Sequence, residues 1–193
     1  MVVALYVDTR RGPYPELIGS DRCWGVERDA KAYPGAGPIV AHPPCGPWGR
    51  LFRLCTKQDP TCALVAADQL RAFGGVLEHP QHSKLWPAAN LPRPLRGEGE
   101  LPLFGGEVWT LVVDQVRWGH PARKRTWLAI AGCPPSQVPP IPSMKKPTHV
   151  VSTSARKSRG HADALPSLWS TAAHLTPPAF AKWLVELAGR CSR

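Results

Sequence analysis

A cysteine in a loop rich in proline and glycine is the first feature that could do chemistry. Residues 41–49 read AHPPCGPWG and follow an apolar run at 38–42 that we predict to be a buried strand. The carboxyl end of a strand is where open α/β sheets place their ligands. Cys45 could therefore be a nucleophilic thiolate, activated by positive surroundings. The alternative is a buried structural cysteine in a Pro-rich turn.

A carboxylate at the end of another predicted strand is the second feature. Glu78 interrupts the apolar run 75–79 and is followed by His79 and Pro80. A buried carboxylate is costly unless it is paired or functional. If the two strands are parallel neighbours, Cys45 and Glu78 lie at the same edge of the sheet. The alternative is a surface carboxylate where the strand reaches solvent.

A basic turn before a further apolar run is the third feature. Residues 115–128 read QVRWGHPARKRTWL and place four cations within nine residues. A guanidinium from this turn could be directed at a base or a phosphate. The alternative is a positively charged hairpin without a ligand.

An α/β fold would position these three segments. Five apolar runs predict strands, at residues 2–7, 38–42, 75–79, 108–113 and 126–131. Between the second and third runs, Asp59 is a plausible N-cap for a helix that ends at Gly74. A strand, a helix and a strand in this order form a βαβ unit, so we expect a mainly parallel, Rossmann-like sheet flanked by helices. A C-terminal helix at 177–189 has one apolar face and should pack back on the sheet.

Composition narrows the class of protein. The chain has 193 residues and a formal charge of +10, which favours a polyanionic partner such as DNA. Its 23 prolines and 17 glycines exclude an all-helical bundle. We expect no signal peptide and no membrane span, because the first apolar run is short and lacks a basic region before it. Six dispersed cysteines then indicate reduced thiols in a cytoplasm.

The positive charge is concentrated in one window. No acidic residue occurs between Asp114 and Asp163. We expect this window to contact phosphates rather than form only a solvated face. The predicted DNA-binding residues are Arg117, Lys124, Lys145, Lys146, Arg156, Lys157 and Arg159.

Taken in order, these motifs resemble the DNA cytosine-5 methyltransferases. That family has a Pro-Pro-Cys loop after a strand, a Glu-Asn-Val/Pro tripeptide ending the next strand, and a later Gln-x-Arg-x-Arg segment entering a strand. The matching segments here are 43–45, 78–80 and 122–125, and 119–126 is closer still to the Gly-His-Pro-x-x-Lys-x-Thr form of phage-type members. The resemblance covers residues 2–132 and indicates a mobile-element or phage genome, hence a host cytoplasm.

The resemblance implies a reaction and a set of residues. Cys45 would add to C6 of cytosine and so activate C5 for methyl transfer from S-adenosylmethionine. Glu78 would contact N3 and the exocyclic amine, and Arg123 or Arg125 would hold the O2 side. Segment 24–30 resembles the family's strand that ends in an acidic residue holding the cofactor ribose. The cofactor contacts implied are Tyr6, Asp8, Glu27 and Asp29.

The chain also departs from the family. Residues 6–12 lack the two glycines of the family's cofactor motif, and no large target-recognition domain is present. The sequence therefore predicts a minimal, truncated form. We expect a catalytic domain at 1–132, a Pro-rich basic linker at 133–162 and a C-terminal segment at 163–193.

Other functions fit parts of the same pattern. One is modification of cytosine with another donor, as in thymidylate-synthase-like chemistry, or its deamination, on single strands or nucleotides. The zinc deaminase pattern is missing, and we predict no metal. A second alternative is a non-catalytic basic DNA-binding protein on a methyltransferase scaffold.

Overall fold

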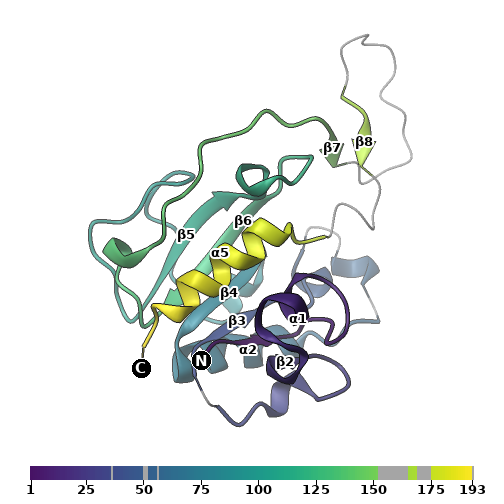
Figure 1. Cartoon of the computed structure of the whole chain (residues 1–193), viewed down its shortest axis with the longest axis vertical. Helices are drawn as coiled ribbons and strands as arrows, with labels where there is room; N and C mark the ends of the chain where they lie inside the picture. Colours follow the sequence, from purple (N-terminus) through teal and green to yellow (C-terminus); the bar gives the residue numbers. More distant parts are fainter. Residues whose placement is uncertain (36, 50–51, 56, 152–164, 169–174, 193) are drawn as a thin grey trace.

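A six-stranded mixed sheet with helices on both faces forms the body of the molecule (Figure 1). The computed structural model describes residues 1–35, 37–49, 52–55, 57–151, 165–168 and 175–192. The sheet order is β2-β1-β3-β4-β6-β5. Its strands are β1 (Val3–Leu5), β2 (Cys23–Trp24), β3 (Ile39–Ala41), β4 (Gly75–Pro80), β5 (Val108–Asp114) and β6 (Arg125–Ala131).

The prediction of a mainly parallel sheet describes only one half of this sheet. Strands β2, β1, β3 and β4 are parallel, whereas β6 pairs antiparallel with both β4 and β5. The turn between β5 and β6 is too short for the crossover that a parallel pair needs, so these two strands form an antiparallel hairpin. All five strands predicted from the sequence are present.

Two hydrophobic layers hold the helices against the sheet. On one face, α1 (Pro13–Ile18) and α5 (Pro178–Gly189) cover side chains such as Val40 and Leu128. On the other face, α2 (Thr61–Phe73) and α3 (Leu85–Ala88) cover Leu77 and Ala129. In Figure 1, α5 lies in front of the sheet, with α1 beside it. The alternation follows from strand geometry, because successive side chains point to opposite faces.

The C-terminal helix and the Pro-rich stretch before it pack on the same face. Phe180, Leu184 and Leu187 of α5 are fully buried, as the apolar spacing predicts. Trp183 donates its indole N–H to the Pro140 carbonyl at 3.1 Å. Arg190 contacts the Gln137 carbonyl at 2.9 Å, so the stretch expected as a linker is held against the domain between residues 137 and 140.

Short elements complete the structure. They are the 3-10 helices η1 (Ser20–Arg22), η2 (Ala30–Ala32), η3 (Gly46–Trp48), η4 (Phe52–Leu54), η5 (Gln115–Trp118) and η6 (Pro135–Gln137), and the paired strands β7 (Val150–Val151) and β8 (Ser167–Leu168). Within the described ranges, no helix is both long enough and apolar enough to cross a membrane.

Gly75 allows β3 and β4 to approach each other at the start of β4. Its φ of +113° is disfavoured for other residues, and a Cβ there would collide with the Ile39 carbonyl oxygen. We expect Gly75→Ala to lower the free energy of unfolding by about 3 kcal/mol or more, since backbone strain and a clash add. Urea denaturation followed by circular dichroism measures this loss.

Gly119→Ala is the matched control for this prediction. Gly119 also has a positive φ, +96°, but nothing lies within 4 Å of its Cβ position. Only backbone strain applies there, and its cost is about 1 kcal/mol. Equal losses for the two variants would contradict the steric explanation.

Candidate active site at the carboxyl edge of the sheet

The three chemical motifs meet at one edge of the sheet. The parallel strands β1, β2, β3 and β4 all end there, and antiparallel β6 begins there. Cys45 follows β3, Glu78 lies near the end of β4, and Arg125 is the first residue of β6. The fold therefore brings together segments that are far apart in the sequence.

A buried chain of hydrogen bonds surrounds Glu78. Its Oε2 accepts from Nδ1 of His42 at 3.0 Å, and its Oε1 accepts from Nε2 of Gln115 at 3.0 Å. The other ring nitrogen of His42, Nε2, lies 2.5 Å from the hydroxyl of Tyr14. Gln115 also donates to the hydroxyl of Thr126 at 3.0 Å. These contacts tie together the residue directly after β3 and four elements: α1, β4, η5 and β6.

The charge of Glu78 is set by these neighbours. Burial by itself raises the pKa of this carboxyl group, but the hydrogen bond from His42 and the charges of His42, Lys124 and His79 lower its pKa to about 2. Glu78 is therefore a carboxylate at neutral pH. Each of its oxygens still has a lone pair for a further donor such as an exocyclic amine.

His79 is a buried histidine next to the cysteine loop. The residue is 1% exposed, and its Nδ1 lies 2.7 Å from the hydroxyl of Ser83. Burial lowers the pKa of His79 to about 4, against the opposing effects of Glu78 and of the Pro44 and Pro43 carbonyls. The imidazole is therefore neutral at pH 7 and lies against the backbone of Pro43 and Pro44 in the loop.

Cys45 is a protonated thiol in the free protein. Burial raises its pKa, the negative charge of Glu78 raises it further, and Lys124 opposes both effects. The expectation of a thiolate activated by positive surroundings is therefore wrong for the free protein. Gly46 lets the cysteine loop pack against Gln58, because a Cβ at residue 46 would collide with that side chain. The Gln58 side chain also accepts a hydrogen bond from the Gly46 N–H at 3.1 Å.

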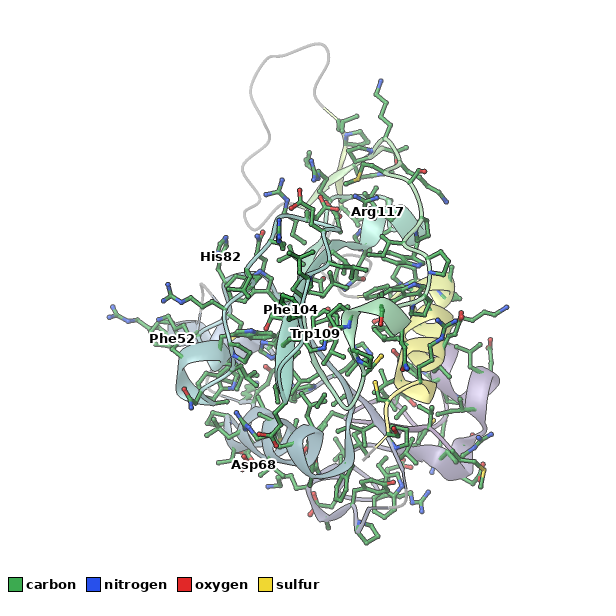
Figure 2. All side chains as sticks on the ribbon, turned by 90° about the vertical axis from the view of Figure 1, so that its left-hand side faces the viewer. Phe52, Asp68, His82, Phe104, Trp109 and Arg117 are labelled. Carbon is green, nitrogen blue, oxygen red and sulfur yellow. The ribbon has the colours of Figure 1, made fainter. Side chains whose placement is uncertain are left out.

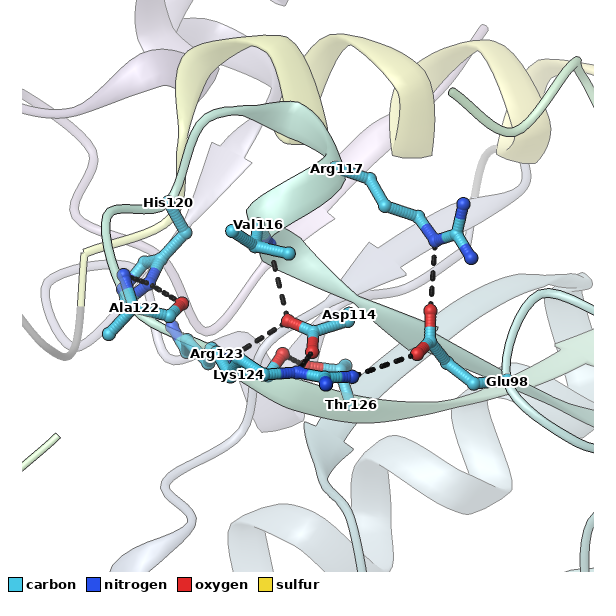
Figure 3. Close-up of polar contacts among 9 residues, drawn as sticks. All are labelled: Glu98, Asp114, Val116, Arg117, His120, Ala122, Arg123, Lys124 and Thr126. Atoms are coloured by element: carbon cyan, nitrogen blue, oxygen red, sulfur yellow. Dashed lines mark hydrogen bonds and ion pairs between the residues drawn. The ribbon is translucent and has the colours of Figure 1, made fainter. Parts of the chain in front are cut away.

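Two arginines with predicted roles form ion pairs: Arg117, predicted to contact DNA, and Arg123, predicted to hold the O2 side of the base (Figure 3). Nε of Arg117 lies 2.8 Å from Glu98, and its Nη1 donates to the Pro142 carbonyl at 2.7 Å. Nε of Arg123 lies 2.7 Å from Asp114, and its Nη2 lies 3.2 Å from Glu98. The Arg117 side chain is only 15% exposed, so little of it is accessible for the predicted contact with DNA.

The remaining predicted cations have different positions. Arg125 is exposed, and unlike Arg123 it forms no ion pair with any carboxylate of the described residues. Nζ of Lys124 donates to the Leu175 carbonyl at 3.2 Å, and its charge acts on both Cys45 and Glu78. Lys145 and Lys146 are exposed. Arg156, Lys157 and Arg159 lie outside the described residues.

A pocket of about 710 Å³ lies beside the cysteine loop, where β1 and β3 are neighbours. The order of strands reverses at this point, because β2 lies on one side of β1 while β3 and β4 lie on the other. All four residues predicted to bind a cofactor line the pocket: Tyr6, Asp8, Glu27 and Asp29. The lining also includes Pro44 of the cysteine loop.

The pocket is acidic on a strongly basic protein. Asp8, Glu27, Asp29 and Asp59 line it, against the two cations Lys31 and Lys57. Nζ of Lys31 lies 3.0 Å from Asp59 and joins the segment after β2 to the start of α2. This charge balance favours a ligand that carries positive charge over a nucleotide with several phosphates.

Two pocket residues have backbone conformations that normally favour glycine. Tyr6 has a φ of +60° and Asp29 a φ of +45°. The hydroxyl of Tyr6 donates to Gln69 at 2.9 Å, and Asp29 accepts from the backbone N–H of Lys31 at 3.2 Å. These side-chain contacts hold the two turns in conformations that glycine would adopt without strain.

Sequence reasoning did not assign a role to His42, Gln115 or Tyr14. His42 and Gln115 stood within the quoted motifs, but only the structure joins them to Glu78. The sequence did contain a signal for His42. A buried carboxylate requires hydrogen-bond donors, and His42 stands at the end of the predicted strand 38–42, next to the strand of Glu78. In the part of the chain that the structure describes, no group of three His, Cys, Asp or Glu side chains is arranged to bind a metal ion.

Comparisons with models of known protein families, with curated proteins and with solved structures found no match to this chain.

Glu78→Gln should make Cys45 more reactive. Removing the carboxylate removes one cause of the raised pKa, so the thiolate fraction at pH 8 should increase. We expect iodoacetamide to alkylate Cys45 severalfold faster in Glu78→Gln than in the unchanged protein, as measured by peptide mass spectrometry over time.

Glu186→Gln, an exposed change on α5, is the control for this alkylation experiment. It should leave the rate at Cys45 unchanged. An unchanged rate in Glu78→Gln as well, with the fold intact by circular dichroism, would show that the two groups are not electrostatically coupled.

Proposed function

We propose that this protein methylates cytosine at C5 in DNA, with Cys45 as the nucleophile and S-adenosylmethionine as the donor. The observation that carries the proposal is that Cys45 and Glu78 lie beside the acidic pocket at one sheet edge, in the order of motifs that resembles the cytosine-5 methyltransferases. The position of the pocket where the strand order reverses supports a Rossmann-like assignment for the parallel half of the sheet.

The residues that line the pocket fit the donor. A volume of about 710 Å³ lies within the range of small-molecule sites. S-adenosylmethionine carries a sulfonium and an ammonium group, which carboxylates stabilise. Tyr6, Asp8, Glu27 and Asp29 are the residues that would hold it. When bound, it would supply an electrophilic methyl group.

The chemistry at the base would begin with Cys45. Its thiol must first give its proton to water, and Lys124 is the described cation whose charge favours the thiolate. A bond then forms between Sγ and C6 as the electrons of the C5–C6 double bond move toward C5. The carboxylate of Glu78 would accept from the exocyclic amine and hold the ring during this addition. After methylation, loss of the C5 proton and release of Sγ from C6 restore the aromatic ring and the free cysteine.

The raised pKa of Cys45 favours a second candidate function. A half-buried thiol that is protonated at neutral pH is also what a structural cysteine would be. In that case the protein would be a non-catalytic DNA-binding protein on the same scaffold. Salt-sensitive DNA binding without any modified base would establish this alternative.

Nucleoside mass spectrometry of DNA from cells that express the protein tests the proposed reaction. We expect 5-methylcytosine, whose added mass identifies the donor group, and we expect Cys45→Ala to abolish it. Cys55→Ala is the matched control, because Cys55 is a half-buried cysteine in the adjacent segment. Undiminished modification by the purified Cys45→Ala protein would exclude the nucleophilic role.

Binding of the donor is a separate prediction. Asp29→Asn should weaken S-adenosylmethionine binding about fivefold or more in calorimetry, because one pocket carboxylate loses its charge. Asp68→Asn makes the same change on the exposed side of α2 and should have no effect (Figure 2). Equal affinities for Asp29→Asn and the unchanged protein would contradict the proposal that the pocket binds S-adenosylmethionine.

A further inference from the structure

Basic and aromatic side chains form a continuous surface beside the cysteine loop. This surface, the basic track, consists of Phe52, Arg53, His82, Lys84 and Arg125. Arg53, His82, Lys84 and Arg125 are exposed, and Phe52 is half-buried. Figure 2 shows Phe52 and His82 toward the same side of the molecule.

Contacts between three segments make the track continuous. The backbone N–H of Lys84 donates to the Trp48 carbonyl at 2.9 Å, which joins the turn after β4 to η3 directly after Cys45. Nζ of Lys84 lies 3.3 Å from the ring centroid of Phe52. On the other side, the N–H of Gln81 donates to the Arg125 carbonyl at 3.0 Å. The track therefore runs from η4 across the turn after β4 to the first residue of β6.

The track has one sign of charge. Its three segments come from stretches of sequence without any acidic residue, namely 30–58, 79–97 and 115–162. The carboxylates of the pocket lie on the opposite side of the cysteine loop, after β1 and β2 and at the start of α2. A polyanion is thus attracted to the β4–β6 side of Cys45 rather than to the pocket.

An aromatic ring is held outward within this charged surface. His82 has a φ of +64°, an unusual conformation for a residue other than glycine. Its imidazole packs edge-on against Trp127, with ring centroids 5.2 Å apart, and Trp127 packs in turn against Trp86 at 5.3 Å. The indole N–H of Trp127 is buried, and no hydrogen-bond partner for it exists among the described residues. Trp127 therefore supports one side of the His82 ring, while His82 itself stays exposed to solvent.

We propose that the basic track binds single-stranded nucleic acid, with an unpaired base stacked on His82 and phosphates on Arg53, Lys84 and Arg125. This inference rests on the proposed function for its biological meaning, and it identifies the substrate of that function as an unpaired strand. Cations alone would bind the phosphates of a duplex equally well. An aromatic ring, however, can stack only on a base whose face is free. An unpaired strand also presents C6 of cytosine to Cys45 without the cost of flipping the base out of a duplex.

Fluorescence anisotropy with the full chain tests the track. The probes are a labelled 12-nucleotide DNA strand, an RNA strand of the same sequence, and the corresponding DNA duplex. We expect at least one single strand to bind about tenfold more tightly than the duplex. The comparison of DNA with RNA distinguishes the two sources of the same chemistry. Duplex binding as tight as, or tighter than, both single strands would overturn the inference.

Variants of His82 separate stacking from charge. Asn tolerates the left-handed backbone of residue 82 but has no ring. We expect His82→Asn to weaken single-strand binding about fivefold and to leave duplex binding unchanged, because the loss of one stacked base has roughly this effect. His82→Phe should retain the affinity for single strands. Unchanged binding of His82→Asn would exclude the stacking role.

Variants of the cations measure the phosphate contacts. Arg53→Ala, Lys84→Ala and Arg125→Ala should each reduce the slope of log affinity against log salt by about 0.7 for a single strand. Lys182→Ala, on the exposed side of α5, is the matched control and should leave the slope unchanged. Equal effects of Lys182→Ala and the three track variants would show that only net charge matters.

The outcomes for the track and for the proposed function are distinguishable. Selective single-strand binding without any modified cytosine would support the track and contradict the methyltransferase proposal. Modification of duplex DNA alone, with no preference for single strands in binding, would contradict the track and leave the methyltransferase proposal standing.

Discussion

The buried carboxylate of Glu78 is the constraint on which the arrangement of this sheet edge depends. An ionised carboxylate cannot be removed from water without hydrogen-bond donors and compensating charge. His42 and Gln115 supply the donors; His42 directly follows β3, and Gln115 begins η5 directly after β5. The requirement of one side chain thus fixes the relative positions of the strands that carry Cys45 and the basic turn.

Charge on the two sides of the cysteine loop is separated by the topology of the sheet. The turns after β1 and β2 carry the carboxylates of the pocket, whereas the segments around β4 and β6 carry cations. Because β6 is antiparallel, its first residue lies at the same edge as the last residues of β3 and β4. A parallel strand in this position would place Arg125 at the opposite edge, far from Cys45.

Sequence reasoning predicted the strands well because their apolar runs are continuous and bounded by proline or glycine. It could not give the direction of β6, since hydrophobic periodicity is the same in parallel and antiparallel strands. It did not assign β2 a place in the sheet from periodicity, because a strand of two residues has none to show. Cys45 and Glu78 were singled out because their types are unusual in such positions. The ion pairs of Arg117 and Arg123 with Glu98 were missed, because nothing in a basic run indicates a distant carboxylate.

Helix α5 shares one hydrophobic layer with the start of the chain. Val2 and Ala4 belong to the same hydrophobic layer as Leu184 and Leu187 of α5. Because α5 begins more than 170 residues after β1, this layer joins segments that are far apart in the sequence. Such contacts carry a high cost of loop closure, so this face of the sheet completes its packing late in folding.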